Sequence, residues 1–179
     1  MPGNIVSSEL PASDLGNIDI AKNGGKPPAC RRQAALQMKI RLLMLGKTRR
    51  PEMIATLGDY VKRIARACPI EVTEVRDGEA ALKKLDADRA ATALLLDAGG
   101  KPYDSEAFAK WVGEQRDRGT REVIFVCGDA EGFPEALRER VKQKISLSAM
   151  TYSHELARVM LAEQIYRAFA ILAGSPYPK

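Results

Sequence analysis

The sequence predicts one α/β domain, built as a mainly parallel sheet with helices on both faces. From Met38 onward, strand-like segments alternate regularly with segments of helical periodicity, which is typical of parallel sheets covered on both sides. The length of 179 residues suits one domain better than two. Apolar residues make up 45% of the chain, so a substantial core can form.

The first half of this alternation is expected to supply two strands and two helices. Residues 39–45 read as an apolar strand that ends at Gly46. Pro51 suits the first turn of a helix, and apolar residues recur from there at helical spacing to residue 65. Residues 70–75 alternate between apolar and polar side chains, which predicts a strand, and a short helix follows over 79–85.

The middle of the chain is expected to add two more strands and two more helices. Residues 91–96 form a buried-looking strand that ends in Asp97, and Ser105 caps a helix running to about residue 118. Residues 122–126 are rich in β-branched and aromatic side chains, which favour a strand. Pro134 then opens a short helix.

A fifth strand over 144–147 precedes a long C-terminal helix. Ser153 caps this helix, which stops at Gly174 just before Pro176. Its apolar residues lie on more than one face. The helix therefore packs either against its own sheet and a second subunit, or entirely within one domain.

Residues 1–37 differ in composition from the rest of the chain. They are rich in Gly, Pro, Ser and Asn, contain no aromatic residue and show no lasting periodicity. Such composition favours disorder. We expect either a disordered extension or a mis-called start, with translation beginning at Met38, and in both cases a folded domain over 38–179.

Composition limits the possible partners and compartment. The net charge of +5 permits an anionic partner such as nucleic acid but does not require one. Cys30, Cys68 and Cys127 are isolated and His154 is the only histidine, so neither a zinc site nor any other metal is expected. Without a signal peptide or a long apolar run, the protein is expected to be cytoplasmic and to have no membrane partner.

Three segments that follow predicted strands are candidates for a ligand site, namely 96–104, 127–133 and 146–154. In parallel sheets, ligands bind beyond the carboxyl ends of the strands. The glycines of the first two segments match neither GxGxxG nor GxxxxGK[ST], which disfavours a nicotinamide dehydrogenase or a P-loop NTPase. These glycines either let the backbone approach a flat ligand closely or simply form turns.

The third segment mixes small polar groups with apolar walls. Such a mixture suits a cofactor that has an adenine ring and a polar tail, although a solvated strand-to-helix connection has the same pattern. His154, in the first turn of the last helix, is expected to accept a proton, bind a ligand or bond to a nearby carbonyl. The polar residues are Ser146, Ser148, Thr151 and Ser153, and the apolar ones are Leu147, Ala149 and Met150.

In their order along the chain, these motifs resemble the RlmH family. The family comprises small bacterial 23S rRNA pseudouridine-N3 methyltransferases of the SPOUT superfamily, and the resemblance runs from Lys39 to Lys179. The most specific part is the Ser-Leu-Ser-Ala-Met-Thr segment followed by the Tyr-Arg-Ala-Phe of the last helix. The motifs that carry it are 96–104, 128–133, 145–151, 162–169 and Pro176-Tyr177.

The resemblance implies a C-terminal trefoil knot, which chain patterning alone does not predict because knots are nearly absent among folds. It also implies a homodimer that binds S-adenosylmethionine in the knot and acts on 23S rRNA within the assembled ribosome. His154, Arg158 and Tyr177 are substrate candidates; Arg158 is expected either to meet an RNA phosphate or to form an internal salt bridge to a glutamate. Carried over by position, the cofactor contacts are Leu96, Gly128, Leu147, Ser148, Ala149, Met150, Thr151 and Tyr152.

The sequence departs from the family pattern at three places. Asp129 stands where the family usually has a second glycine, and could attract the cofactor, act as a base or point to water. Tyr152-Ser153 replaces the common Leu-Pro, and the tail Pro176-Tyr177-Pro178-Lys179 lacks the usual histidine. The candidates for the proton acceptor are therefore His154, Tyr177 and Asp129. Two other functions stay open: an RNA- or ribosome-binding protein with weakened catalysis, or a related SPOUT methyltransferase with another RNA target.

Overall fold

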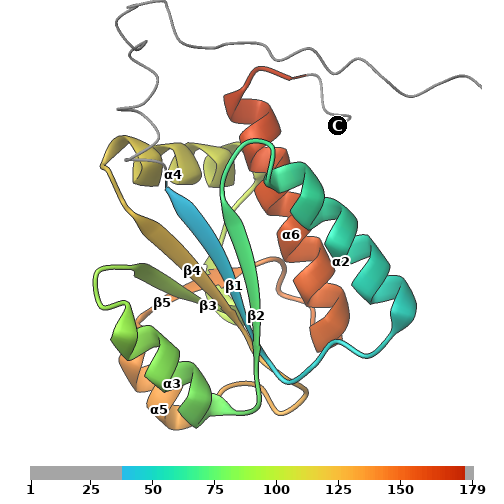
Figure 1. The fold of residues 1–179 in the computed structure, drawn as a ribbon, viewed down its shortest axis with the longest axis vertical. Coiled ribbons are helices and arrows are strands. Elements are labelled where there is room, and N and C mark those ends of the chain that lie inside the picture. The colour runs from blue at the N-terminus through green and yellow to red at the C-terminus, as the bar shows by residue number, and fades with distance from the viewer. Residues whose placement is uncertain (1–37, 176–179) are drawn as a thin grey trace, which may run out of the picture.

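A computed structural model describes residues 38–175, which alternate strictly between strand and helix (Figure 1). Within this range five strands form one parallel sheet in the order β2-β1-β4-β3-β5, which confirms the predicted fold class. The expectations for residues 1–37 and for Tyr177 lie outside the described residues, and the knot stays a prediction. The elements are β1 (Lys39–Leu45), α2 (Pro51–Ile64), β2 (Ile70–Val75), α3 (Gly78–Ala87), β3 (Thr92–Pro102), α4 (Ser105–Asp117), β4 (Glu122–Cys127), α5 (Glu135–Arg140), β5 (Gln143–Ser146) and α6 (His154–Leu172).

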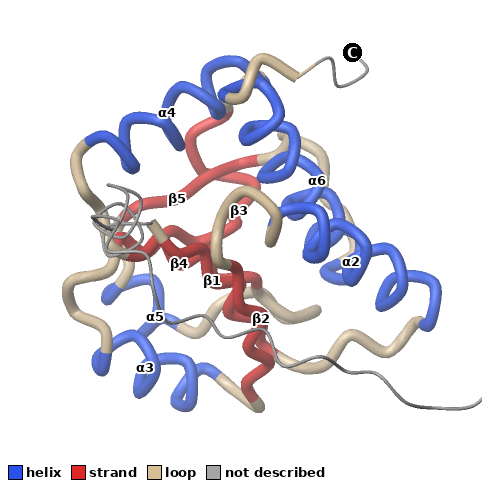
Figure 2. The backbone as a smooth tube through the Cα atoms, turned by 45° about the horizontal axis from the view of Figure 1, so that its top comes forward, coloured by secondary structure: helices blue, strands red, loops and turns tan. Residues whose placement is uncertain are grey.

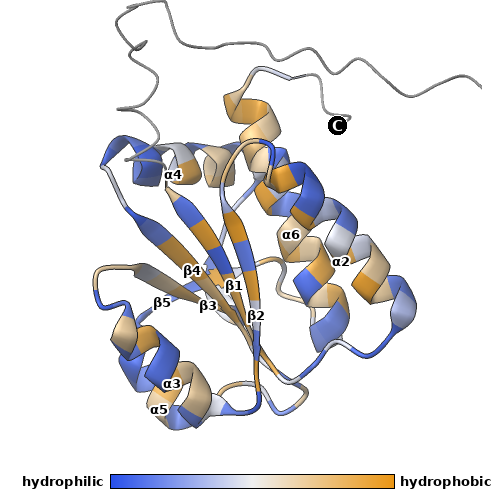
Figure 3. Cartoon of the chain, viewed as in Figure 1, coloured by the Kyte–Doolittle hydropathy of each residue, from blue (hydrophilic) through white to orange (hydrophobic). Residues whose placement is uncertain are grey.

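Helices cover both faces of the sheet (Figure 2). Side chains along β1 point alternately to the two faces of the sheet, and both faces are buried. Ile40, Leu42 and Met44 belong to one buried cluster, and Leu43 and Leu45 belong to the other. The first cluster contains the apolar residues of α2, α4 and α6, and the second contains those of α3 and α5. Polar and apolar residues are interspersed along the helices, as the hydropathy colouring shows (Figure 3).

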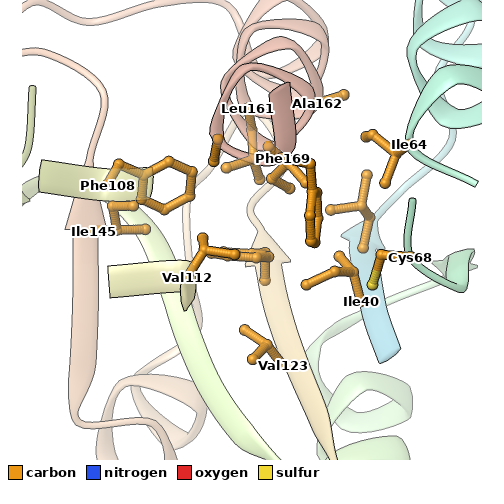
Figure 4. Close-up of a cluster of buried hydrophobic side chains, with 14 of the residues drawn as sticks. Ile40, Ile64, Cys68, Phe108, Val112, Val123, Ile145, Leu161, Ala162 and Phe169 are labelled. Carbon is orange, nitrogen blue, oxygen red and sulfur yellow. The ribbon is translucent and has the colours of Figure 1, made fainter. Parts of the chain in front are cut away.

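The helix α6 lies at the centre of the larger cluster, between α2 and α4 (Figure 4). Leu161 and Ile165 are fully buried and Phe169 is 9% exposed. Packing within the domain accounts for the buried apolar residues of α6, whereas Leu156 and Met160 are half-buried and Ile171 is exposed. The expectation of a second subunit rests on the family resemblance.

The strand β3 runs to Pro102, so the prediction of a loop directly after Leu96 is wrong. Its pairing with β5 shifts register between Leu96 and Lys101, and the chain between them bulges before it rejoins β5. Gly100 makes this possible, because a Cβ at that position would lie 2.6 Å from the carbonyl carbon of Ile145. Glycine is unfavourable in strands, so the sequence after Leu96 suggested a turn, although this part of the chain belongs to β3 and pairs with β5.

Two predicted helix caps also need correction. The N-cap of α4 is Asp104 rather than Ser105, and its carboxylate accepts a hydrogen bond from the backbone N–H of Ala107 at 2.7 Å. The Ser105 hydroxyl instead bonds to Gln164 on α6 at 3.2 Å. Ser153 does occupy the N-cap position of α6, but its side chain makes no capping hydrogen bond.

Candidate functional site

A cavity of about 550 Å³ lies beside the bulge of β3 and beyond the carboxyl ends of β4 and β5. All three candidate segments contribute to its wall, as expected for the carboxyl edge of a parallel sheet. His154 and Asp129 also line it, whereas Ala149 is exposed and is not among the lining residues. The other residues carried over as cofactor contacts line the cavity: Leu96, Gly128, Leu147, Ser148, Met150, Thr151 and Tyr152.

The turn after β4 is tight and depends on two glycines. A Cβ at Gly128 would lie 2.8 Å from the carbonyl oxygen of Gly132, closer than real Cβ atoms approach. Gly132 itself has a φ of +87°, a conformation that glycine adopts most readily. Asp129 closes the turn, since its carboxylate accepts the backbone N–H of Glu131 at 2.9 Å and its carbonyl accepts that of Gly132 at 3.2 Å.

Serines order the segment after β5 by bonding to its own backbone. The Ser146 hydroxyl donates to the carbonyl of Ser148 at 2.8 Å, and the Ser148 hydroxyl accepts the N–H of Met150 at 3.0 Å. Met150 is 72% exposed at the edge of the cavity. Two of the small polar groups expected to meet a ligand therefore shape the segment, so recognition there falls to backbone groups and neighbouring side chains.

An ion pair that the sequence did not single out joins two walls of the cavity. Arg138 on α5 contacts the carboxylate of Asp97 at 2.8 Å and also donates to the carbonyl of Phe133 at 3.2 Å. The backbone N–H of Gly99 and the guanidinium of Arg138 lower the pKa of Asp97, so its carboxylate stays charged. In the sequence, Arg138 lies in a short predicted helix that carries no motif. Asp97 stood out only as the end of a predicted strand.

The placement of Arg158 contradicts both expectations for it. Its side chain is fully buried and donates to the Thr48 hydroxyl at 3.0 Å, to the Leu45 carbonyl, and to the Gly128 carbonyl at 3.5 Å. No described carboxylate lies within salt-bridge distance of it, and its Nε lacks a hydrogen-bond partner among the described residues. A guanidinium in this position holds backbone carbonyls at the ends of β1 and β4, and is closed off from an RNA phosphate.

Glu155 ties the start of α6 to the segment before α2. Its carboxylate accepts the backbone N–H groups of Arg49 at 2.9 Å and Arg50 at 3.2 Å, and lies 4.0 Å from Nε2 of His154. These hydrogen bonds, with the Arg49 N–H first, lower the pKa of Glu155 below the ordinary glutamate value. The same contacts hold His154 at the wall of the cavity.

This lowered pKa predicts a pH-dependent stabilisation. A carboxylate whose folded-state pKa is depressed stabilises the fold above its unfolded-state pKa and loses that effect as the pH falls through the folded-state value. We therefore expect Glu155→Gln to lower the melting temperature at pH 7, and the difference from wild type to shrink steadily below about pH 4.5. Thermal scans between pH 3 and pH 7 check this, with the exposed Glu139→Gln as the control. An equal difference at every pH would contradict it.

Cysteine and metal chemistry find little support in residues 38–175. Burial raises the pKa of Cys127, at the base of the cavity, to about 12, and that of Cys68 to about 11, so both thiols stay protonated and unreactive. No group of three metal-ligating side chains occurs in the described range. Within it, no helix has the length and apolar character to cross a membrane.

Comparison with known proteins points to methyltransferases. The family model "Predicted SPOUT methyltransferase" matches residues 38–178. A protein of Pelobacter propionicus named Ribosomal RNA large subunit methyltransferase H is 41% identical over 151 residues, covering 78% of this chain and 99% of the relative. Its namesake in Solibacter usitatus is 42% identical over 143 residues, with 78% and 99% covered. A probable methylase family protein of Haemophilus influenzae superposes with a TM-score of 0.49 at 11% identity, over 80% of this chain and 71% of that one.

Proposed function

Because the chain belongs to the SPOUT methyltransferase family, and within it to the RlmH group, we propose that it methylates 23S rRNA with S-adenosylmethionine as the methyl donor. The target implied by the RlmH resemblance is N3 of a pseudouridine. The observation that carries the proposal is the meeting of the three motif-bearing segments, distant in sequence, around one cavity. Methyl transfer of this kind needs alignment of the two reactants and loss of the N3 proton, but no metal.

The size and lining of the cavity support S-adenosylmethionine as its ligand. Its volume of about 550 Å³ is typical of small-molecule sites. The missing side chain at Gly128 lets the backbone of Gly132 pack closely against it, which gives the turn in the cavity wall its shape. Leu96 and Leu147 supply apolar walls for an adenine ring. When bound, the cofactor supplies an electrophilic methyl group.

The residues of the chain then have three tasks: to hold the donor, to orient the base and to receive a proton. The Gly128 turn and the backbone of 147–152 would hold the donor, with the Asp97–Arg138 pair keeping the two walls together. His154 and Asp129 line the cavity and are the candidate proton acceptors within the described residues. Tyr177 remains the third candidate and lies outside them.

The proposal extends to the assembly in which the protein works. We propose that it acts as a homodimer on the assembled ribosome, as the RlmH resemblance implies. Ribosomes lie in the bacterial cytoplasm, so the same proposal places the enzyme there. The sulfonium donor and the rRNA substrate are its small-molecule and macromolecular partners.

Mass spectrometry of 23S rRNA tests the proposed reaction. In a strain lacking the gene, one pseudouridine should lose a methyl group, and a plasmid copy of the wild-type gene should restore it. The purified protein with S-adenosylmethionine should methylate ribosomes isolated from the deletion strain. Persistence of the methyl group without the gene would refute the assignment.

One observation favours a second candidate, an RNA- or ribosome-binding protein with weakened catalysis. Pro178 stands where the family usually has a histidine, so that side chain cannot serve in binding or proton transfer. This candidate predicts ribosome binding without methyl transfer, and weak or absent binding of S-adenosylmethionine in a calorimetric titration. A related SPOUT methyltransferase with another RNA target would instead leave 23S rRNA unchanged and remove a methyl group elsewhere, which mass spectrometry of total RNA detects.

A further inference from the structure

A short basic segment, here called the basic loop, follows β1 beside the cavity. It comprises Lys47, Thr48, Arg49 and Arg50, of which only Thr48 is buried. It lies at the same edge of the sheet as the cavity, because β1 pairs in parallel with β4. The residue just before the loop lies close to the cavity wall, since a Cβ at Gly46 would lie 3.9 Å from the Cβ of Asp129.

Carboxylates of other elements hold the backbone of the basic loop through hydrogen bonds. The N–H of Thr48 donates to Glu74 at 2.9 Å, and those of Arg49 and Arg50 donate to Glu155. The Thr48 hydroxyl accepts a hydrogen bond from the buried Arg158. The loop is therefore fixed from inside, and ordering it on binding costs little entropy.

Two cationic side chains of the loop are left without an ion pair. Arg50 pairs with Glu52 at 3.1 Å. For Lys47 and Arg49, by contrast, no salt bridge to any carboxylate of residues 38–175 forms, and both are exposed. Their charges are free to meet an anion from solution, directly beside a cavity in which a nucleobase would have to lie.

We infer that Lys47 and Arg49 bind phosphates of the RNA backbone next to the nucleotide that is methylated. The inference rests on the proposed function and names a substrate contact for that site. Phosphate contacts fix the register of a nucleic acid without reading its bases. Here they would place the target base over the cavity while leaving the cofactor site untouched, since neither residue lines it.

The double variant Lys47→Gln/Arg49→Gln tests the inference against a matched control. The control, Arg89→Gln/Arg121→Gln, removes two exposed cations from the opposite edge of the sheet, before β3 and β4. Affinity for ribosomes from the deletion strain is measured across a range of salt concentrations. The log–log salt slope should fall by about two in the first variant and stay at the wild-type value in the control. Equal slopes in both variants would overturn the inference.

Two further measurements separate this inference from the proposed function. Calorimetric titration with S-adenosylmethionine should give wild-type affinity for both variants, and a loss only in the first would show that the loop serves the cofactor, which overturns the inference. A photoreactive residue in place of Lys47 should crosslink to rRNA, whereas a crosslink to a ribosomal protein would overturn it. If the wild type binds ribosomes with the expected slope but methylates nothing, the proposed function fails while the phosphate contacts stand.

Discussion

Replacing Gly128 with alanine is expected to abolish most cofactor binding while leaving the fold intact. The new Cβ would meet the Gly132 carbonyl oxygen at 2.8 Å, and that atom belongs to backbone that cannot rotate away. The turn must then shift as a unit, because Asp129 and Gly132 are bonded to each other within it. We expect the affinity for S-adenosylmethionine to fall roughly 100-fold, equivalent to about 2.8 kcal/mol.

Calorimetric titration and a methylation assay on ribosomes measure this effect. The matched control is Gly58→Ala, since a Cβ there meets nothing within 4 Å and the residue lies inside α2. Alanine favours helices over glycine, so the control should be slightly more stable and fully active. Wild-type cofactor affinity in Gly128→Ala would show that the turn after β4 is not part of the cofactor site.

Much of the architecture could be predicted because it depends on local pattern. The alternation of residues along β1 and the helical spacing after Pro51 determine which face each side chain covers, whatever lies opposite. The end of β3 could not be predicted in this way. Pairing of Lys101 with Ile145 depends on a strand 44 residues further along the chain, and the two glycines between 98 and 101 have the composition of a turn.

The candidate site, like the fold, could be predicted only in part from the sequence. The meeting of the three segments follows from a general rule about parallel sheets, so the sequence was sufficient to expect it. The contact between Asp97 and Arg138 joins residues 41 positions apart, and no spacing rule links a residue of β3 to a helix three elements later. The sequence also offered no reason to single out the basic loop, because the carboxylates that bond to its backbone are distant in the chain.

Arg158 shows most clearly what pattern cannot supply. On the sequence alone, an arginine among apolar residues near the start of a helix is a surface residue or half of a salt bridge. The structure instead directs it toward the Leu45 carbonyl, 113 residues away, and the Gly128 carbonyl, 30 residues away. Its role depends on where two strands end, which becomes known only once the sheet is assembled.

Replacing Arg158 with methionine is therefore expected to destabilise the protein and to weaken cofactor binding together. Removal of the buried charge relieves a desolvation cost, but the Thr48 hydroxyl and the carbonyls of Leu45 and Gly128 stay behind in the interior without their donor. Each buried polar group left unpaired costs about 1–3 kcal/mol, and this loss outweighs the relief. We expect a net loss of about 3 kcal/mol, which lowers the melting temperature of a domain of this size by roughly 6–12 °C.

The variant Thr48→Val separates the two contributions of Arg158. It removes one partner but keeps the guanidinium on both carbonyls, so it should cost less stability and leave the affinity for S-adenosylmethionine close to wild type. Arg158→Lys keeps the charge, yet a single ammonium cannot replace both Nη1, which bonds to Thr48, and Nη2, which bonds to the two carbonyls. This variant should therefore fall between wild type and Arg158→Met. If Arg158→Met kept full stability and lost only salt-dependent affinity for ribosomes, the arginine would be acting on an RNA phosphate, as its sequence position first suggested. The burial of its side chain argues for the opposite result, in which stability and cofactor affinity fall and the salt slope stays unchanged.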